Sequence, residues 1–309
     1  MLDNQTHGIE DTKGTLMNLM KRVQNQASRQ LDLGVSTPQM QYQIGEKGQA
    51  SLILEASGGE PTRIFDVNEH CNGQIASSTG FDSRTFARLR YQYPEELSNL
   101  VNKIFMTEKK KHTLRAFAQD NGLNRHMARA LVSNKFKLFD NHHLLQAVLE
   151  PLMESIANWT IVHGDITDKR MYIQFRSRDI EGSGATVNDI MASGIGLSNS
   201  EVGAGSVQCY QIVWTLACLN GQQTTNKTRK AHITSAREDS GTWELLTEEA
   251  KDADNTALIL QLRDLTKAYA SREMFDEVIE KMRLAHENKI NGTAQEAVEN
   301  LGKVINLTK

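Results

Sequence analysis

The strongest constraint on the fold is a stretch near residues 207 to 219 that is apolar on both faces. Alternate residues of an extended chain point to opposite sides. Apolar residues here occupy both sets, with Tyr210, Ile212, Trp214 and Leu216 on one side and Cys209, Val213, Ala217 and Leu219 on the other. A strand of this kind is covered on both sides. The sequence therefore predicts a sheet enclosed within a layered fold.

Two predicted hairpins surround this strand. The segment WTIVHGDITDKRMYIQFRSRD turns near Thr167 to Lys169. Its second strand separates by parity, with Met171, Ile173 and Phe175 facing one way and Arg170, Tyr172, Gln174, Arg176 and Arg178 the other. The second hairpin turns in the polar bend SNSEVGAGS. We expect residues 159 to 219 to form one continuous antiparallel sheet with Asn199 to Ser206 at an exposed tip.

The same bend has a second interpretation, as a ligand loop. Gly203 and Gly205 permit the positive φ that points backbone amides together around an anion. Glu201 argues against this, because it places a negative charge at the mouth of the loop. Asn199 and Ser200 are good turn formers without any ligand. The hairpin tip is therefore favoured, and the ligand loop is the alternative.

Helical periodicity flanks the predicted sheet. Apolar residues recur at helical spacing in residues 12 to 31, 94 to 105 and 142 to 158, and Pro151 should kink the last of these helices. A further hairpin is expected to turn at Asp120, Asn121 and Gly122. Beyond Ser235 helical patterning takes over, and a capping box from Thr293 to Glu296 begins the last predicted helix.

These elements predict an α+β protein, with a hairpin-rich antiparallel sheet packed on a long helix. Residues 34 to 62 mix Gly, Ser and Gln with short apolar pieces, which favours loosely ordered chain around one short strand. We therefore expect a helical N-terminal arm (1–60), an α+β core (61–237) and a helical, acidic C-terminal region (238–309).

Composition favours a cytoplasmic protein with reduced thiols. No run of about 18 apolar residues is present to span a bilayer, and the first residues lack the pattern of a secretory signal. Cys71, Cys209 and Cys218 form no CxxC pair. Two of them lie in the apolar run, so we expect buried thiols rather than disulfides.

No catalytic machinery stands out, and no cofactor or metal is expected. The motifs NEHC, HH and HGD lack the ligand spacing of zinc sites. Adjacent histidines such as His142 and His143 diverge by about 100° on a helix and so do not readily share one metal. Nucleophile-elbow, phosphate-loop and dinucleotide motifs are also missing.

Basic residues concentrate in the middle of the chain. Residues 84 to 137 contain twelve Lys and Arg against four Asp and Glu, whereas residues 238 to 309 contain nine against fifteen. Cations on a sheet face with an interleaved aromatic suit a single-stranded nucleic acid. The candidate binding residues are Lys109, Lys110, Lys111, Arg115, Arg125, Arg129, Lys135, Lys137, Arg170, Tyr172, Arg176 and Arg178. The alternative is that these residues form a solvated face with salt bridges to the acidic C-terminal region. Spacing alone does not favour either interpretation.

Three segments resemble a known family. They are FDSRTFARLRYQYPEELSNLVN, LRAFAQDNGLNRHMARALVSNKFKLFDNHHLLQAVLEPL and LSNSEVGAGSVQCYQIVWTLACLNGQ. Together they look like the phage and plasmid-like family catalogued as domain of unknown function number nine hundred and thirty-two. The usual aspartate and arginine around SNKF are replaced by Asn134 and Lys137. The resemblance implies a mobile-element protein of a bacterial host, with no established activity. The order of elements is also similar to that of Rad-type single-strand annealing proteins.

The function predicted first is therefore a non-enzymatic single-stranded DNA-binding protein of a phage or mobile element. It would form a homo-oligomer and promote annealing or recombination, with host or phage replication proteins as candidate partners and without a membrane. One alternative is a host-interaction or anti-defence protein that binds a protein partner through its acidic helices. Another is a metal-dependent nuclease. If the protein binds single-stranded DNA, we expect the acidic C-terminal region to lie away from the basic face or to cover it reversibly.

Overall fold

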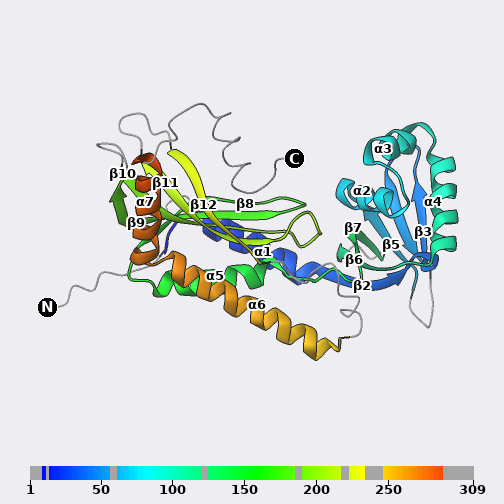
Figure 1. The fold of residues 1–309 in the computed structure, drawn as a ribbon. Coiled ribbons are helices and arrows are strands. Elements are labelled where there is room, and N and C mark those ends of the chain that lie inside the picture. Colours follow the sequence, from blue (N-terminus) through cyan, green and yellow to red (C-terminus); the bar gives the residue numbers. More distant parts are fainter. Residues whose placement is uncertain are drawn as a thin grey trace, which may run out of the picture.

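The computed structural model describes residues 9–11, 14–55, 61–119, 124–184, 190–216, 223–233 and 246–287. Its elements form two lobes, each with one six-stranded sheet and its own helices (Figure 1). The coarse fold class, α+β, is confirmed. The strands divide into two mixed sheets, however, where the sequence had predicted one hairpin-rich antiparallel sheet.

Sheet A has the strand order β1-β8-β9-β10-β11-β12. Its strands are β1 (Ile9–Glu10), β8 (Trp159–Ile166), β9 (Met171–Ser183), β10 (Ile190–Asn199), β11 (Val207–Leu216) and β12 (Gln223–Ile233). Strands β8 to β12 are antiparallel neighbours, whereas β1 runs parallel to β8. The predicted antiparallel sheet is therefore confirmed from residue 159 to 216, and Trp214 is 2% exposed.

Four helices pack with sheet A (Figure 1). They are α1 (Thr15–Arg29), α5 (Asn141–Glu154), α6 (Glu248–Tyr269) and α7 (Arg272–Glu287). Each contributes to one apolar core with the strands, through residues such as Leu19, Val148, Leu262 and Phe275. The C-terminal helices are thus part of this core. Helices that cover the basic face reversibly would not bury these apolar residues in the core. The prediction of a reversible cover is therefore wrong for α6 and α7.

Two glycines of β10 make room for aromatic rings on the other face of sheet A. A Cβ at Gly194 would lie 2.2 Å from Nε1 of Trp214, and one at Gly196 would lie 2.4 Å from the ring of Tyr210. Gly196 is paired with Tyr210 itself, whereas Gly194 is paired with Ile212, two residues before Trp214 on the same side of β11. The glycines of GIGLSN are therefore needed for close packing of aromatic rings on a strand.

Sheet B has the strand order β2-β6-β7-β5-β4-β3. Its strands are β2 (Gln30–Ser36), β3 (Met40–Ile44), β4 (Ala50–Leu54), β5 (Arg63–Val67), β6 (Lys111–Phe117) and β7 (Arg125–Ser133). A short 3-10 helix, η1 (Thr37–Gln39), connects β2 to β3. The helices α2 (Glu69–Ser78), α3 (Ser83–Gln92) and α4 (Pro94–Glu108) bury Ile75, Phe86 and Val101 against the sheet. Among the described strands of sheet B, β5 and β7 are the one parallel pair.

The structure corrects the expectation for residues 34 to 62. That segment was expected to be loosely ordered with one short strand, but the described part of it holds the end of β2 together with β3 and β4. Tyr42 of β3 is fully buried, and its hydroxyl donates to Oδ1 of Asn72 in α2 at 2.7 Å. Pairing with distant strands and a helix therefore orders a sequence whose local pattern is weak.

The predicted helices at residues 12–31, 94–105 and 142–158 are confirmed as α1, α4 and α5. Cys71 and Cys209 are buried free thiols, as expected, and burial raises the pKa of the Cys209 thiol to about 12. The turn at residues 120–122, Cys218 and the helix expected from Thr293 lie outside the described residues. None of the helices in the described ranges is both long and apolar enough to cross a membrane.

Candidate functional site

The chain passes between the two lobes twice, and a hairpin turn makes a third contact. The first passage runs from α1 into β2 at Gln30, and the second returns to α5 at Asp140. The third contact is the bend between β10 and β11, residues 200 to 206, which reaches the lobe that contains sheet B. We call the buried polar cluster where these three segments meet the junction; it comprises Asp32, Arg115, Arg129, Asp140 and Glu201.

Arg115 of β6 binds all three segments. Its side chain is fully buried. Nε and Nη2 donate to the two carboxylate oxygens of Asp32 at 2.9 and 3.0 Å, and Nη2 also donates to Oδ1 of Asp140 at 2.6 Å. Nη1 donates to the carbonyl oxygen of Glu201 at 2.7 Å. Burial disfavours the charge on Arg115, but the two carboxylates outweigh it and raise its pKa.

The carboxylate of Glu201 is the second centre of the junction. Its side chain is 4% exposed, and that of Arg129 is 6% exposed. Nη2 of Arg129 donates to one carboxylate oxygen at 2.8 Å, and the backbone N–H of Asn141 donates to the other at 2.8 Å. Asn141 is the first residue of α5, so Glu201 also places a negative charge at a helix N-terminus, where it is favoured.

The rest of the bend is also bonded across the junction. The side-chain amide of Asn199 donates to the carbonyl of Phe139 at 2.9 Å. The carbonyl of Val202 accepts from Nε2 of Gln74 at 2.8 Å and lies 2.8 Å from Nε2 of His70, both in α2. Residues 199 to 202 are buried, and only Gly203 and Gly205 are exposed.

The prediction of an exposed tip at Asn199 to Ser206 is therefore wrong for its first half. The bend is polar because its groups satisfy partners in the other lobe, and not because water surrounds it. Gly203 does have the positive φ expected of it, at 76°. The carboxylate of Glu201 occupies the position that an anion would need, which argues against the ligand-loop interpretation.

The junction joins residues of the two lobes through buried ion pairs. It combines two cations, Arg115 and Arg129, with three carboxylates, so its formal charge is two minus three, or −1. Burial opposes ionisation of Asp140, yet the guanidinium of Arg115 holds the pKa of this carboxyl below its ordinary value. All five charged side chains are thus used in ion pairs, which favours a structural role.

The structure corrects three of the predicted nucleic-acid residues. Arg115, Arg129 and Lys137 are 0%, 5% and 6% exposed, so their cations face carboxylates and not solvent. Arg129 also lies over the ring of Phe117, 4.1 Å from its centroid. Lys137 forms an ion pair with Asp254 of α6. Lysine and arginine occupy these buried places because each has an acidic partner.

Three more candidates are on the surface but already paired. Arg125 forms a salt bridge with Asp66. Arg178 pairs with Glu10 and donates to Oγ1 of Thr160 at 2.8 Å. Lys110 pairs with Glu108, and its Nζ donates to the carbonyl of Ser78 at 3.0 Å. Exposed pairs of this kind are weak and exchange readily for another anion.

The remaining candidates are accessible. Lys109, Lys111 and Lys135 are exposed, Arg176 is half-buried, and none of these four pairs with an acidic residue in the part of the chain that the structure describes. Arg170 is exposed, and its guanidinium donates to the carbonyl of Ala204. Tyr172 is 41% exposed on the same strand as Arg176.

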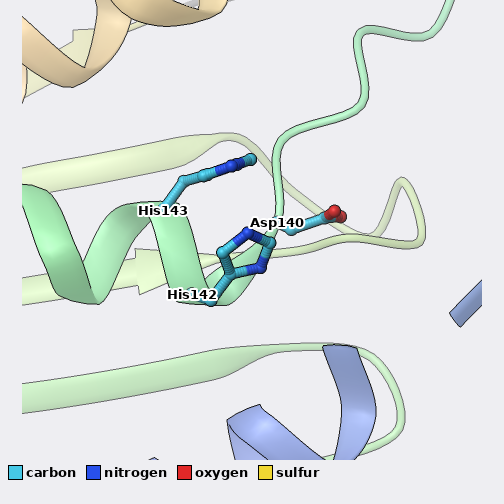
Figure 2. A group of neighbouring side chains, drawn as sticks. All are labelled: Asp140, His142 and His143. Atoms are coloured by element: carbon cyan, nitrogen blue, oxygen red, sulfur yellow. The ribbon is translucent and has the colours of Figure 1, made fainter. Parts of the chain in front are cut away.

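One cluster was missed by sequence reasoning. Asp140, His142 and His143 lie together at the beginning of α5, with one potential ligand atom from each residue all within 4.8 Å of one another (Figure 2). The two imidazole rings are 3.9 Å apart between centroids. Burial and the neighbouring His142 lower the pKa of His143. The spacing Asp-x-His-His was visible in the sequence, but the assumed divergence of adjacent side chains concealed it.

A scan against protein-family models, a search of curated proteins and a search of solved structures each find no match to this chain.

Proposed function

We propose that this chain is a non-catalytic single-stranded DNA-binding protein of a phage or mobile element, acting in the cytoplasm of a bacterial host as a homo-oligomer. The observation that supports this proposal is the placement of its accessible cations. Lys111, Lys135 and Arg170 come from both lobes: the first two lie near the ends of the paired strands β6 and β7, and Phe136, beside Lys135, and Arg170 both contact the bend between β10 and β11.

The contacts that connect these cations can be followed through the fold. Lys111 begins β6, whose next residue, His112, is paired with Ser133 at the end of β7. Lys135 follows in the turn after β7. Phe136, beside it, lies 3.7 Å from where a Cβ at Gly203 would be. Arg170 then donates to Ala204 of the same bend.

This surface suits a flexible, charged strand. Lysine and arginine side chains neutralise phosphates, and an exposed ring such as Tyr172 offers a stacking platform for a base. Ion pairs of the junction join the two lobes, so we expect the cations of both lobes to keep their spacing. Strand binding or annealing needs no nucleophile or metal, and each charged side chain of the junction is already paired with an opposite charge.

The charge component is tested by a triple variant. Lys109→Gln, Lys111→Gln and Lys135→Gln together should weaken binding of a fluorescent oligo(dT) and flatten the slope of log affinity against log salt by roughly two units, at about 0.7 per phosphate contact. The matched control is Lys47→Gln, Lys281→Gln and Arg283→Gln, which removes three exposed cations elsewhere on the protein. Equal slopes for the two triple variants would refute the proposed surface.

The stacking component is tested at Tyr172. Tyr172→Ala should weaken binding by about 1–3 kcal/mol without changing the salt slope, because stacking releases no counterions. Tyr172→Phe should keep nearly all of the affinity, since it keeps the ring. If Tyr172→Phe is as weak as Tyr172→Ala, the ring does not act as a stacking platform.

A second candidate function is protein-partner binding beside the acidic helices. A groove of about 590 Å³ lies between the end of α5 and the start of α7, and Pro151, Ala157 and Ala270 line it. Ile156 at its edge is 87% exposed. Such a groove fits an apolar side chain of a partner peptide. If the protein fails to bind single strands at low salt while Ile156→Asp abolishes capture of a host or phage protein, this function replaces the first.

A further inference from the structure

We propose that Asp140, His142 and His143 bind one divalent transition-metal cation, of the class of Zn²⁺, at the beginning of α5. This inference concerns a site separate from the exposed cations, and it does not depend on DNA binding. It reverses the expectation of no metal drawn from the sequence.

The geometry permits coordination with small side-chain movements. The three potential ligand atoms lie within 4.8 Å of one another. In a tetrahedral site with bonds of about 2.0–2.1 Å, neighbouring ligand atoms are roughly 3.3 Å apart. Each side chain therefore needs to shift by only about 1 Å. Figure 2 shows that Asp140 and both rings project from the same turn, so the rotation expected from ideal helical spacing does not separate them.

The imidazole nitrogens are free to act as ligands. Neither ring of His142 or His143 has a hydrogen-bond partner among the described residues, and Nδ1 of His143 is buried without one. A buried polar atom without a partner costs about 1–3 kcal/mol. A bound cation would give this nitrogen the partner that the protein does not supply.

Asp140 can coordinate a metal while it keeps its place in the junction. Oδ1 accepts from Arg115 at 2.6 Å and Oδ2 from Gln30 at 3.1 Å. Each carboxylate oxygen has two lone pairs, so one on each oxygen is still available. Hydrogen bonds of this kind orient a ligating carboxylate. The formal charge of −1 at the junction also favours a nearby cation over an anion.

The ligand set determines the class of metal. Two imidazole nitrogens and one carboxylate oxygen suit Zn²⁺, Co²⁺ or Ni²⁺, whereas Mg²⁺ and Ca²⁺ prefer oxygen ligands alone. Three protein ligands leave a position for water. A cation here would connect Asp140, where the second passage of the chain ends, to the first turn of α5, next to Arg115.

Titration of the metal-free full-length protein tests the site. Calorimetry with ZnCl₂ should show one cation per chain with micromolar affinity or better, and Co²⁺ should give the visible absorption of a low-coordinate nitrogen and oxygen site. His142→Ala and His143→Ala should each weaken Zn²⁺ binding about tenfold or more. His163→Ala, which removes an exposed histidine of β8, is the matched control and should leave the affinity unchanged.

Circular dichroism of each variant verifies that its fold is kept, and His142→Asn and His143→Asn give a second, conservative pair. The proposal is overturned if the wild-type protein binds Zn²⁺ no more tightly than about 100 μM, roughly the strength of unorganised surface ligands. It is equally overturned if a folded variant that combines His142→Ala with His143→Ala binds Zn²⁺ as tightly as the wild type. DNA affinity measured with and without a chelator reports separately on the proposed function.

Discussion

Glu201→Gln is the sharpest perturbation of the junction. The substitution removes one negative charge and keeps the shape of the side chain. The amide oxygen can still accept the backbone N–H of Asn141, which donates to the carboxylate at 2.8 Å in the wild type. The change therefore isolates the ion pair with Arg129, whose side chain is only 6% exposed.

The magnitude follows from the distance and the burial. At 2.8 Å and an effective dielectric constant of about 20, the attraction between Glu201 and Arg129 is about 6 kcal/mol. Desolvation of the two charges offsets part of this attraction in the wild type. In the variant the cation of Arg129 stays buried, with the ring of Phe117 as its remaining partner. We expect the free energy of unfolding to fall by about 3–5 kcal/mol.

Urea unfolding followed by circular dichroism measures this loss. Glu280→Gln is the control, because it breaks an exposed pair with Arg283 and should change the free energy of unfolding by less than about 1 kcal/mol. Arg129→Met with Glu201→Leu removes both charges and should recover much of the loss. If Glu201→Gln is as stable as the wild type to within about 0.5 kcal/mol, the ion pair does not stabilise the junction.

Two further predictions concern packing and pH. Gly194→Ala should lower the free energy of unfolding by about 1–3 kcal/mol in the same urea assay, because its Cβ would clash with Trp214. The control is Gly34→Ala in β2. Its Cβ meets no atom within 4 Å, so this variant should be as stable as the wild type or more stable. Burial, with the Lys110 ammonium, lowers the pKa of His112, so the unfolded chain takes up a proton first near pH 6.5. The free energy of unfolding should therefore decrease as the pH falls from about 7.5 to 5.5, and less steeply in His112→Gln; identical slopes would exclude this histidine.

Short-range patterns predicted the elements of this fold well. The helical spacing of Leu97, Val101 and Phe105 identified α4, and all three residues are buried. The parity of β9 was also correct, since Met171 and Ile173 are buried and Tyr172 is exposed. In both cases one face of a single element carries the signal, so no distant residue is needed to interpret it.

Sheet B was difficult to predict because its order depends on distant partners. Strands β2 and β6 are paired, yet Leu33 and Leu114 are far apart in the chain. Strand β5 lies between β7 and β4, so its neighbours include a strand that comes more than fifty residues later. Pairing of this kind is decided by tertiary packing and not by local propensity.

The junction could not be derived from spacing, because two of its ion pairs join residues 72 and 83 positions apart. Two signals were present. Arg115 and Arg129 each stand within apolar strand segments, where an unpaired charge would be costly. Glu201 stands alone among small and polar residues of a bend. Each indicates a buried partner, but neither identifies which residue it is.

The salt dependence of single-stranded DNA binding by the wild-type protein tests the proposed function most directly. Five of the candidate cations, Lys109, Lys111, Lys135, Arg170 and Arg176, pair with no acidic residue in the part of the chain that the structure describes. At about 0.7 per phosphate contact they predict a slope of roughly −3.5 for log affinity against log salt. Fluorescence anisotropy of a labelled oligo(dT) measures this slope between about 50 and 300 mM salt. Affinity that depends on phosphate contacts falls strongly over a range of this order. A slope near −3.5 supports the account. A slope near zero, or no measurable binding at the lowest salt, contradicts it.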